Sequence, residues 1–457
     1  MSSLVKKSKY EMDMCNGSIM DKLISFSLPL MLSGILQLLF HAVDLVVVGK
    51  FSGSDALAAV GDTTALINVY INLFIGISLG ANVLAARFYA SGREKEMSET
   101  VHTSIAFAVI SGLVVMFVGI ICARGSLELM KTPADVIGQS TLYMRIYFIG
   151  MPFFMVYNYG AAILRAVGDT KRPLYFLVIS GVINAGLNLI LVILFHLGVA
   201  GVAIATVFSQ MISCLLVLWC LCNSKGCYQL HFSGLMLKGV YLKQIFQVGI
   251  PAGIQSTVIT FSNVLLQSSV NSFGSIAMAG YTAANNIFGF LYVTVNSITQ
   301  TCMSFTSQNY AVHKWKRMDK VLLDCILLSL AVTLLLGGGA CVFGKELLGI
   351  YTSDPKVVTC GMEILFYTTA TYFLCGLMDL LPGALRGMGH STVPMLLSIV
   401  GTVGTRLVWI YGLFPICRSL KFLFLSYPAS WLFTILMQVI CFYFVRKKVY
   451  RSMKEQE

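Results

Sequence analysis

Twelve long apolar stretches divide this chain, and they constrain its fold more than any other feature. Each is long enough for a helix to cross a bilayer, which takes about 20 apolar residues. In chain order they are residues 23–48, 57–86, 99–121, 136–162, 173–195, 199–221, 244–271, 277–310, 321–343, 357–384, 393–414 and 422–445. In lipid, only helices and closed barrels satisfy every backbone N–H and C=O group, and these stretches are far too long for barrel strands. We therefore predict an all-α polytopic membrane protein with twelve transmembrane helices.

The composition supports lipid as the solvent for much of the surface. Of the 457 residues, 57% are hydrophobic and only 11% are charged, against about 25% charged in soluble domains. The net charge of +12 would suggest nucleic-acid binding in a soluble protein, but no RNA- or DNA-binding module is present. Most of the 13 cysteines lie inside the apolar stretches, so we expect neither disulfides nor a zinc site. The lipid bilayer is thus an expected partner, and nucleic acid is not.

The basic residues predict the orientation of the chain. If the N-terminus lies inside, the inner segments hold 23 of the 32 Lys and Arg residues and the outer loops hold 7. Membrane proteins collect Lys and Arg on the cytoplasmic side, so both termini are predicted to be cytoplasmic. The first apolar stretch is too long for the hydrophobic part of a signal peptide, so we expect it to remain as a span.

Two loops reveal an internal repeat. Leu164–Pro173 aligns with Leu385–Pro394 at an offset of 221, and Leu, Arg, Gly and Pro recur in register. The same offset pairs further residues along the chain, namely Gly53-Ser54 with Gly274-Ser275, Ala56 and Ala58 with Ala277 and Ala279, Tyr89-Ala90 with Tyr310-Ala311, and Met97 with Met318. Agreement at one offset in separate regions indicates duplication of a six-span unit.

The repeat also predicts the domain organisation. Six spans is an even number, so both copies cross the bilayer in the same direction and form a parallel repeat. We predict an N-terminal six-helix lobe over residues 1–222, a cytoplasmic linker over 223–243, and a C-terminal six-helix lobe over 244–457.

The residues shared by the twin loops have a structural explanation, which we favour over a role in gating. Gly168 and Gly389 permit a tight helix exit, and Pro173 and Pro394 suit the first turn of the next helix. The arginine of each loop is expected to anchor a helix end among headgroups and last-turn carbonyls.

A carboxylate at membrane depth in the first span is the main candidate for chemistry. Gln37, His41 and Asp44 are spaced i, i+4, i+7, which places them on one helix face. A charge there costs roughly 3 kcal/mol, and desolvation disfavours the ionised carboxylate. Asp44 could therefore accept a proton or bind Na⁺ when open to one side. The alternative is a buried aspartate that only hydrogen-bonds His41 or another neighbour.

Polar residues in the fifth and sixth spans are candidates to assist. Ser180, Asn184 and Asn188 share one face of the fifth span, and the sixth span carries Thr206 and Gln210. Amide and hydroxyl oxygens suit a hard cation such as Na⁺, but amides also hold helices together. Both interpretations remain open on the residues alone.

A second polar site is predicted in the C-terminal lobe. It comprises Gln255 and Asn263 in the seventh span, Asp379 in the tenth and Arg406 in the eleventh. Asp379 is either a second protonatable group or an ion-pair partner for Arg386, and we favour the ion pair. Arg406 lies deep in its span and should face protein, a cavity or a lipid headgroup rather than acyl chains.

Catalytic motifs do not stand out in the sequence. There is no P-loop or Walker B segment, so we expect no ATP hydrolysis, and no HExxH or GxSxG occurs in a plausible context. We predict a protein that is not an enzyme, needs no cofactor, and draws on an H⁺ or Na⁺ gradient for any uphill transport.

Four stretches carry a resemblance to a known family. They are Asp44–Gly49, Ala56–Gly61, Ile163–Thr170 and Ala384–Gly389. The chain resembles the multidrug and toxic-compound extrusion (MATE) family, within the multidrug, oligosaccharidyl-lipid and polysaccharide exporters, over about residues 18–448. It looks most like the bacterial branch with damage-inducible-type members. The resemblance implies two six-helix lobes around a central cavity that export organic cations by H⁺- or Na⁺-coupled alternating access, and we expect a monomer in the bacterial plasma (inner) membrane.

The resemblance also implies site residues. Asp44 matches an aspartate that binds the coupling ion, and Asn184 and Thr206 match residues that assist it, so Na⁺ at Asp44, Asn184 and Thr206 is one expectation. Asn188 stands where such members have an aspartate. The seventh span lacks the glutamate that other members use, which moves the expected ion site to the N-terminal lobe, and His41 beside Asp44 is unusual.

Two other functions compete with this prediction. A lipid-linked saccharide flippase of the same superfamily should show a large cationic cavity and often extra spans, whereas the spans here contain few basic residues. A membrane enzyme should show His, Asp or Glu clusters at one membrane face, and a receptor has little use for a twofold parallel repeat. We expect antiport of organic compounds.

Overall fold

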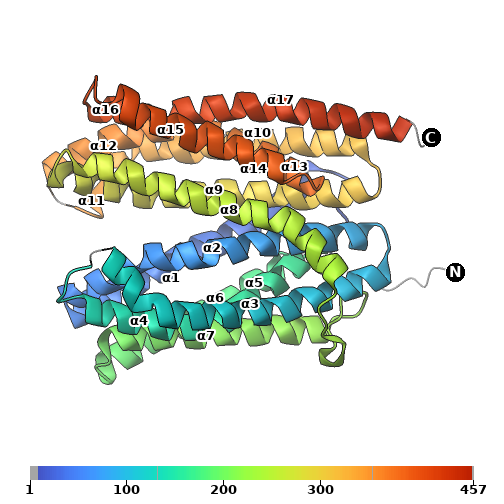
Figure 1. Cartoon of the computed structure of the whole chain (residues 1–457), viewed down its shortest axis with the longest axis horizontal. Helices are drawn as coiled ribbons and strands as arrows, with labels where there is room; N and C mark the ends of the chain where they lie inside the picture. Colours follow the sequence, from blue (N-terminus) through green and yellow to red (C-terminus); the bar gives the residue numbers. More distant parts are fainter. Residues whose placement is uncertain (1–8, 131, 353, 455–457) are drawn as a thin grey trace. The chain divides into compact units, whose positions relative to one another are not determined.

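The computed structural model describes residues 9–130, 132–352 and 354–454, and the described residues form helices joined by short loops, with no β-strand (Figure 1). Contacts divide the chain into two units. Unit 1 is Met1–Asp13 with Leu28–Gly253, and unit 2 is Met14–Ser27 with Ile254–Glu457. The predicted lobes had their boundary at the linker 223–243, whereas the structure counts this linker and the first part of the seventh span with unit 1.

The first part of the chain folds into bundled helices whose lengths match the predicted spans. In order they are α1 (Met20–Ser52), α2 (Ser54–Ala90), α3 (Glu94–Leu129), α4 (Ile137–Ile149), α5 (Met151–Ala166), α6 (Lys171–Leu189), the π-helical η1 (Ile190–Leu194), α7 (Gly198–Cys222), the 3₁₀ turn η2 (Phe232–Gly234) and α8 (Gly239–Asn271). The first residues of α1 belong to unit 2, and α8 passes from unit 1 to unit 2 after Gly253. Each of these two helices contains a proline, Pro29 or Pro251, within about two residues of the point where it changes unit.

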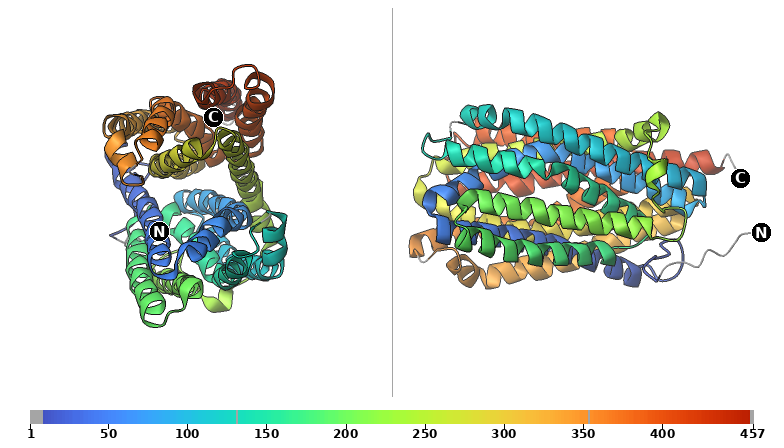
Figure 2. Two further views of the ribbon diagram at one scale, coloured as in Figure 1. Left: turned by 90° about the vertical axis from the view of Figure 1, so that its left-hand side faces the viewer. Right: turned by 90° about the horizontal axis from the view of Figure 1, so that it is seen from below.

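The remaining helices belong to unit 2 and run alongside one another within it (Figure 2). They are α9 (Ser275–Ala311), α10 (Trp315–Val342), α11 (Gly344–Gly349), α12 (Pro355–Thr369), α13 (Tyr372–Gly387), α14 (Thr392–Ser398), the π-helical η3 (Ile399–Gly404), α15 (Thr405–Val408), the π-helical η4 (Trp409–Leu413), α16 (Leu420–Phe424) and α17 (Ser426–Lys454). All twelve predicted stretches therefore lie, to within a few residues, on one helix or on consecutive helices.

Length and composition identify most of these helices as membrane spans. In the described part of the chain, nine helices are long and apolar enough to cross a membrane, and counting the bent pairs α4–α5 and α12–α13 as one span each raises the number to eleven. The pairs bend by 48° and 43°. The remaining predicted span, 277–310, is the helix α9, which is long enough but carries many Ser, Thr, Asn and Gln residues. These polar residues are the reason that the count falls one short of the predicted twelve.

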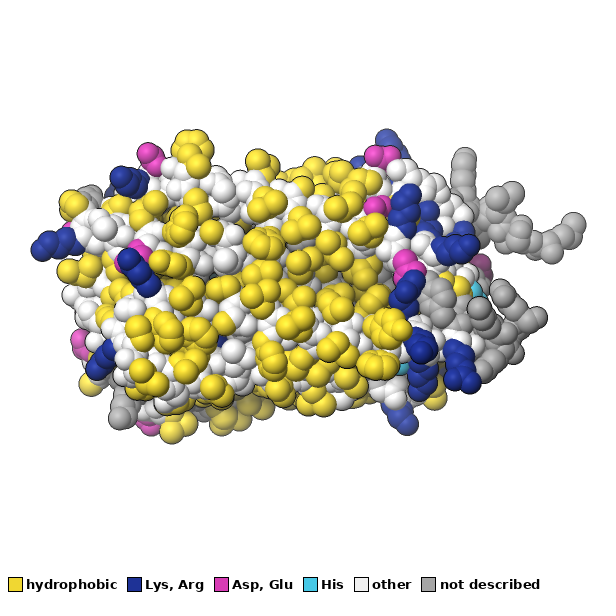
Figure 3. All heavy atoms as spheres, turned by 90° about the horizontal axis from the view of Figure 1, so that it is seen from above, with side chains coloured by type: hydrophobic (Ala, Val, Ile, Leu, Met, Phe, Trp, Pro, Cys, Tyr) yellow, Lys and Arg dark blue, Asp and Glu magenta, His cyan; other side chains and the backbone are white. Residues whose placement is uncertain are grey.

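The outer surface of the helices is apolar in its middle. On the face drawn in Figure 3, over helices such as α17, hydrophobic side chains cover the central part, and Lys and Arg gather towards the two ends. Large side chains such as Leu335 and Ile121 are 75% and 76% exposed. Contiguous apolar surface of this kind is rare on soluble monomers, so we assign it to contact with lipid acyl chains.

Two pairs of glycines bring α2 and α8 into backbone contact within unit 1. A β-carbon on Gly76 would overlap the backbone nitrogen of Gly253, and one on Gly80 would overlap the carbonyl oxygen of Ile245. Gly249 likewise has no room for a β-carbon. Each helix thus presents two small residues four positions apart, a spacing that lets membrane helices approach closely. This packing fixes the first part of α8 to unit 1.

The twin loops have the conformations that the sequence predicted. Gly168 and Gly389 have φ angles of +95° and +85°, which side chains larger than glycine rarely adopt. Pro173 and Pro394 lie in the first turns of α6 and α14. Both loops therefore use glycine to leave one helix and proline to begin the next, and the structural explanation is confirmed for these four residues.

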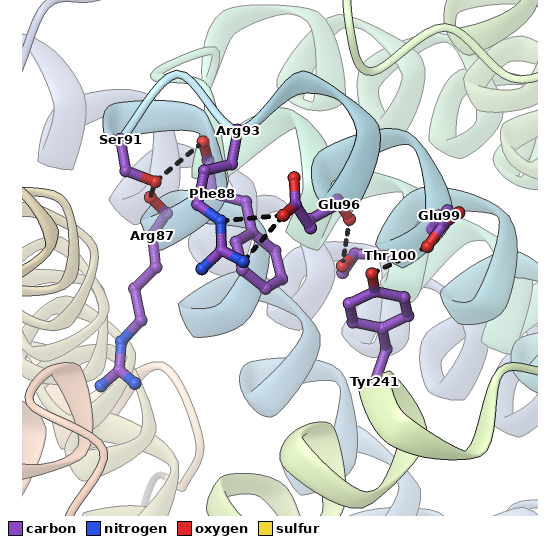
Figure 4. Close-up of polar contacts among 8 residues, drawn as sticks. All are labelled: Arg87, Phe88, Ser91, Arg93, Glu96, Glu99, Thr100 and Tyr241. Carbon is purple, nitrogen blue, oxygen red and sulfur yellow. Dashed lines mark hydrogen bonds and ion pairs between the residues drawn. The ribbon is translucent and has the colours of Figure 1, made fainter.

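A carboxylate near the start of α3 holds the linker before α8. Glu99 accepts a hydrogen bond from the Lys238 ammonium. It also accepts one from the Tyr241 hydroxyl at 2.7 Å (Figure 4). Nearby, Arg93 and Glu96 form an ion pair at 2.7 Å, with the arginine side chain 56% exposed. Glu99 joins segments that are distant in sequence, whereas the Arg93–Glu96 pair is local.

Glu99→Ala is expected to lower the apparent melting temperature of the purified protein by roughly 2 °C, because two hydrogen bonds to a charged group are lost. Arg93→Ala serves as the matched control and should change it by less than about 1 °C, since exposed local ion pairs contribute little. Thermal unfolding in detergent measures both, and equal shifts would contradict the anchoring role of Glu99.

Candidate functional site

The acid predicted at membrane depth lies in a buried chain of polar groups. Asp44 on α1 is only 7% exposed, and its Oδ1 accepts a hydrogen bond from Nδ2 of Asn188 on α6. The same Nδ2 donates to Oδ1 of Asn184 at 3.2 Å. Asn184 is 5% exposed and Asn188 is fully buried. The structure thus brings together three of the predicted ion-coupling residues, Asp44, Asn184 and Asn188.

A glycine on α6 allows α1 to come this close. A β-carbon on Gly181 would overlap the ring of Phe40, which lies one turn before Asp44. Gly181 and Asn188 are seven residues apart and therefore lie on the same face of α6. Two positions after Asn188 the helix continues as the π-helical η1, a distortion often found at functional sites. Close packing of Gly181 against Phe40 therefore positions the polar contact one turn further along α1 and two turns further along α6.

Two tyrosines on α4 accompany Asp44 and were not singled out from the sequence. The rings of Tyr143 and Tyr147 stack with centroids 6.0 Å apart. Both lie close enough for the charge of Asp44 to act on their hydroxyl groups. The i, i+4 spacing of two aromatic residues was visible in the sequence, but aromatic residues are common in membrane spans, so the spacing did not distinguish them.

Three other residues predicted for ion coupling are not bonded to Asp44. Gln37 is exposed and His41 is half-buried, and among the described residues neither hydrogen-bonds Asp44. The hydroxyl of Thr206 donates to the Val202 carbonyl of its own helix at 2.9 Å. The sequence left His41 or another neighbour as the hydrogen-bond partner of Asp44, and in the structure the partner is another neighbour, Asn188.

The predicted second polar site resolves into two separate contacts in unit 2. In the first, Arg386 donates from Nη2 to Oε1 of Gln255 at 2.6 Å, and both side chains are buried. Asp379 interacts electrostatically with Arg386, but no ion pair within 4 Å joins them in the described part of the chain. The favoured Asp379–Arg386 ion pair is thus not a direct contact, although the two charges interact, and the hydrogen bond of Arg386 goes to Gln255 instead. Arg386 is also buried rather than placed among headgroups.

The second contact centres on Arg406. Its Nη1 donates to Oδ1 of Asn263 at 2.7 Å, and its guanidinium carbon lies 4.5 Å from the centroid of the Tyr427 ring. Arg406 is 3% exposed. It faces protein, as expected for a charged residue deep in a span.

The described residues hold no group of three or more His, Cys, Asp or Glu side chains that could bind a metal ion. The site in unit 1 offers a different donor set, with one carboxylate and amide oxygens. Oδ1 of Asn188 is buried and has no hydrogen-bond partner. An unsatisfied buried oxygen beside a carboxylate is an acceptor available to a proton donor or a small hard cation.

The family is decided by the match to a known family model, described as MatE. It matches residues 29–190 and again 251–411, which together make up well over half of the chain. The chain belongs to the MatE family. The double match confirms the internal repeat, and it places α6 with the Asn184–Asn188 turn in the first MatE copy and α15 with Arg406 in the second.

Relatives of this MatE chain carry names that refer to drug export. It is 28% identical over 435 residues to "Probable multidrug resistance protein YoeA" of Bacillus subtilis (strain 168), covering 93% of each chain. It is 21% identical over 387 residues to "Multidrug export protein MepA" of Staphylococcus saprophyticus, covering 84% of this chain and 85% of that protein.

Solved structures share the MatE fold. The outward-facing conformation of a multidrug resistance MATE family transporter of the MOP superfamily matches with a TM-score of 0.88 at 19% identity, over 98% of this chain and 100% of that one. A MOP superfamily transporter from Pyrococcus furiosus, described as having a binding pocket of reverse polarity, also matches with a TM-score of 0.88 at 19% identity, over 97% and 99%.

Proposed function

We propose that this MatE protein is a multidrug efflux transporter that exports organic compounds, cations among them, by H⁺- or Na⁺-coupled antiport with alternating access. The observation that carries the proposal is the buried chain Asp44–Asn188–Asn184 in unit 1. The names of the relatives support multidrug export over the saccharide-flippase alternative. We further propose a monomer in the bacterial plasma membrane with both termini in the cytoplasm.

Asn188 gives Asp44 a partner in either protonation state. When the carboxylate is ionised, the amide nitrogen of Asn188 donates to it, as in the structure. When Asp44 is protonated, its hydroxyl needs an acceptor, and the Asn188 oxygen has no partner. A half-turn of the amide would bring that oxygen to Asp44, since the two ends of an amide have the same shape. With Na⁺, the same oxygen would serve as a ligand beside the carboxylate and Asn184.

The tyrosine pair suggests how an organic cation could compete for Asp44. Aromatic faces attract cations, and the Tyr143–Tyr147 stack lies near the carboxylate. If Asp44 serves either the coupling ion or the organic cation, binding one favours release of the other. Coupling then requires that the ion and the drug bind the inward- and outward-open states with different affinity.

Efflux of a cationic dye from cells that lack other pumps tests the proposal. We expect cells expressing the protein to clear the dye faster than control cells. The pH gradient and the Na⁺ gradient are then collapsed one at a time. We expect only one of the two treatments to lower the rate severalfold, and that treatment identifies the coupling ion. Clearance that persists with both gradients collapsed would contradict ion-coupled antiport.

A further inference from the structure

Arg406 is a buried cation without a matching acid. Among the described residues no carboxylate lies within 4 Å of it, and its one hydrogen bond goes to the neutral amide of Asn263. Its Nε is buried and has no hydrogen-bond partner. A guanidinium has five N–H donors arranged to meet a carboxylate with two parallel hydrogen bonds. Arg406 contacts the ring of Tyr427 and hydrogen-bonds Asn263. The Nε side of its guanidinium, which could bind a carboxylate, has no hydrogen-bond partner.

The internal repeat allows the position of Arg406 to be compared with the polar residues of unit 1. At the offset of 221, Asn184 corresponds to Thr405, and Asp44 corresponds to Leu265. Arg406 is thus one residue from the counterpart of Asn184, and Asn263 lies within one helical turn of the counterpart of Asp44. The first and fifth spans hold a carboxylate and amides, whereas the equivalent spans of unit 2 hold an arginine and an amide.

The backbone beside Arg406 also resembles the backbone beside Asn188. In unit 1, the π-helical η1 begins just after Asn188. In unit 2, Arg406 lies in the short α15 with the π-helical η3 before it and η4 after it. Both polar contacts therefore occur where a span departs from regular α-helix, and the sign of the charge is reversed between them.

We propose that Arg406, with Asn263 and Tyr427, forms an anion-binding site in unit 2 that takes the carboxylate of a transported compound. Arg406 is only 3% exposed, whereas Asn263, which accepts its hydrogen bond, is exposed, so a carboxylate would reach the guanidinium when the Asn263 side chain moves aside. The ring of Tyr427 holds the guanidinium plane from one side. Arg386 is a poorer candidate, because the charge of Asp379 already acts on it. The inference rests on the proposed export function, and it assigns the carboxylate of an exported compound to a particular arginine in unit 2.

A matched pair of dyes tests the site on the purified full chain. Rhodamine B carries a cationic ring system and one carboxylate, and its ethyl ester has the same cation without the carboxylate. Fluorescence anisotropy measures the affinity of each in detergent. We expect the wild type to bind the acid more tightly than the ester by on the order of tenfold, the effect of hydrogen bonds to a charged partner.

Substitutions then assign the preference to Arg406. Arg406→Gln should abolish the preference, so that the acid and the ester bind equally, and Arg406→Lys should retain part of it, because the charge stays and the two-pronged geometry is lost. Arg418→Gln, at an exposed arginine, is the matched control and should behave as wild type. Equal wild-type affinities for acid and ester, or an undiminished preference in Arg406→Gln, would overturn the site.

Transport assays separate this inference from the proposed function. If proteoliposomes export the ester under an ion gradient but the protein shows no preference for the acid, antiport stands and the anion site fails. If the acid binds preferentially and neither dye is exported under any ion gradient, the site stands and the proposed antiport fails.

Discussion

Asp44→Asn is expected to reduce gradient-driven export of a cationic dye in proteoliposomes by at least about tenfold, while the protein still folds. The asparagine keeps the size of the side chain and can hydrogen-bond Asn188, but it can neither take up a proton nor supply a negative charge to Na⁺. The loss of a single charged contact is worth a factor of this order. Initial rates of dye movement after imposing the gradient measure the effect.

A second acid in unit 1 provides the control for Asp44. Asp62 on α2 accepts a hydrogen bond from Thr132 at 2.6 Å and is not hydrogen-bonded to Asn184 or Asn188 in the described part of the chain. Asp62→Asn should retain most of the gradient-driven rate. Equal losses in the two variants would mean that any removed acid disturbs the protein, and full export by Asp44→Asn would remove Asp44 from the coupling mechanism.

Gly80→Ala is expected to destabilise unit 1 by roughly 3 kcal/mol or more, because its methyl group would collide with backbone atoms that cannot rotate away. The β-carbon would overlap the carbonyl oxygen of Ile245, so α8 would have to move away from α2. The expected result is a large fall in the yield of monodisperse protein and in its melting temperature.

Gly61 on the same helix is the matched control for this substitution. A β-carbon there meets no atom within 4 Å, so Gly61→Ala should leave the yield and melting temperature unchanged. Size-exclusion chromatography and thermal unfolding compare the two variants. A Gly80→Ala protein as stable as Gly61→Ala would show that α2 and α8 are not packed through their backbones.

The sequence predicted the spans and the repeat because both depend on local patterns. Apolar length alone located the apolar core of each span, although α3 continues to Leu129, beyond the predicted end at 121. The twin loops kept the glycine and proline that their turns need. The helix α9 differs in that its polar residues do not prevent helix formation but lower its hydropathy. The breaks in the bent pairs were not predicted, because a bend at Gly150 depends on contacts with other helices.

The partners of the polar residues could be predicted only in part. The periodicity placed Asn184 and Asn188 on one face, and the structure puts that face against Asp44. Periodicity does not say which face meets which helix, so it could not choose Asn188 over His41 as the partner of Asp44, or Gln255 over Asp379 as the partner of Arg386. The glycine contacts Gly76–Gly253 and Gly181–Phe40 are likewise properties of helix pairs.

The most direct test of the central claim, that Asp44 carries the coupling ion, measures the ion itself. Coupling is reciprocal, so a dye gradient imposed across proteoliposomes should drive the coupling ion in the opposite direction without any initial ion gradient. A pH-sensitive dye records H⁺ movement and radioactive Na⁺ records Na⁺ movement. The account predicts that one of the two ions moves with the wild type and that neither moves with Asp44→Asn. Ion movement of the same size in Asp44→Asn would contradict it.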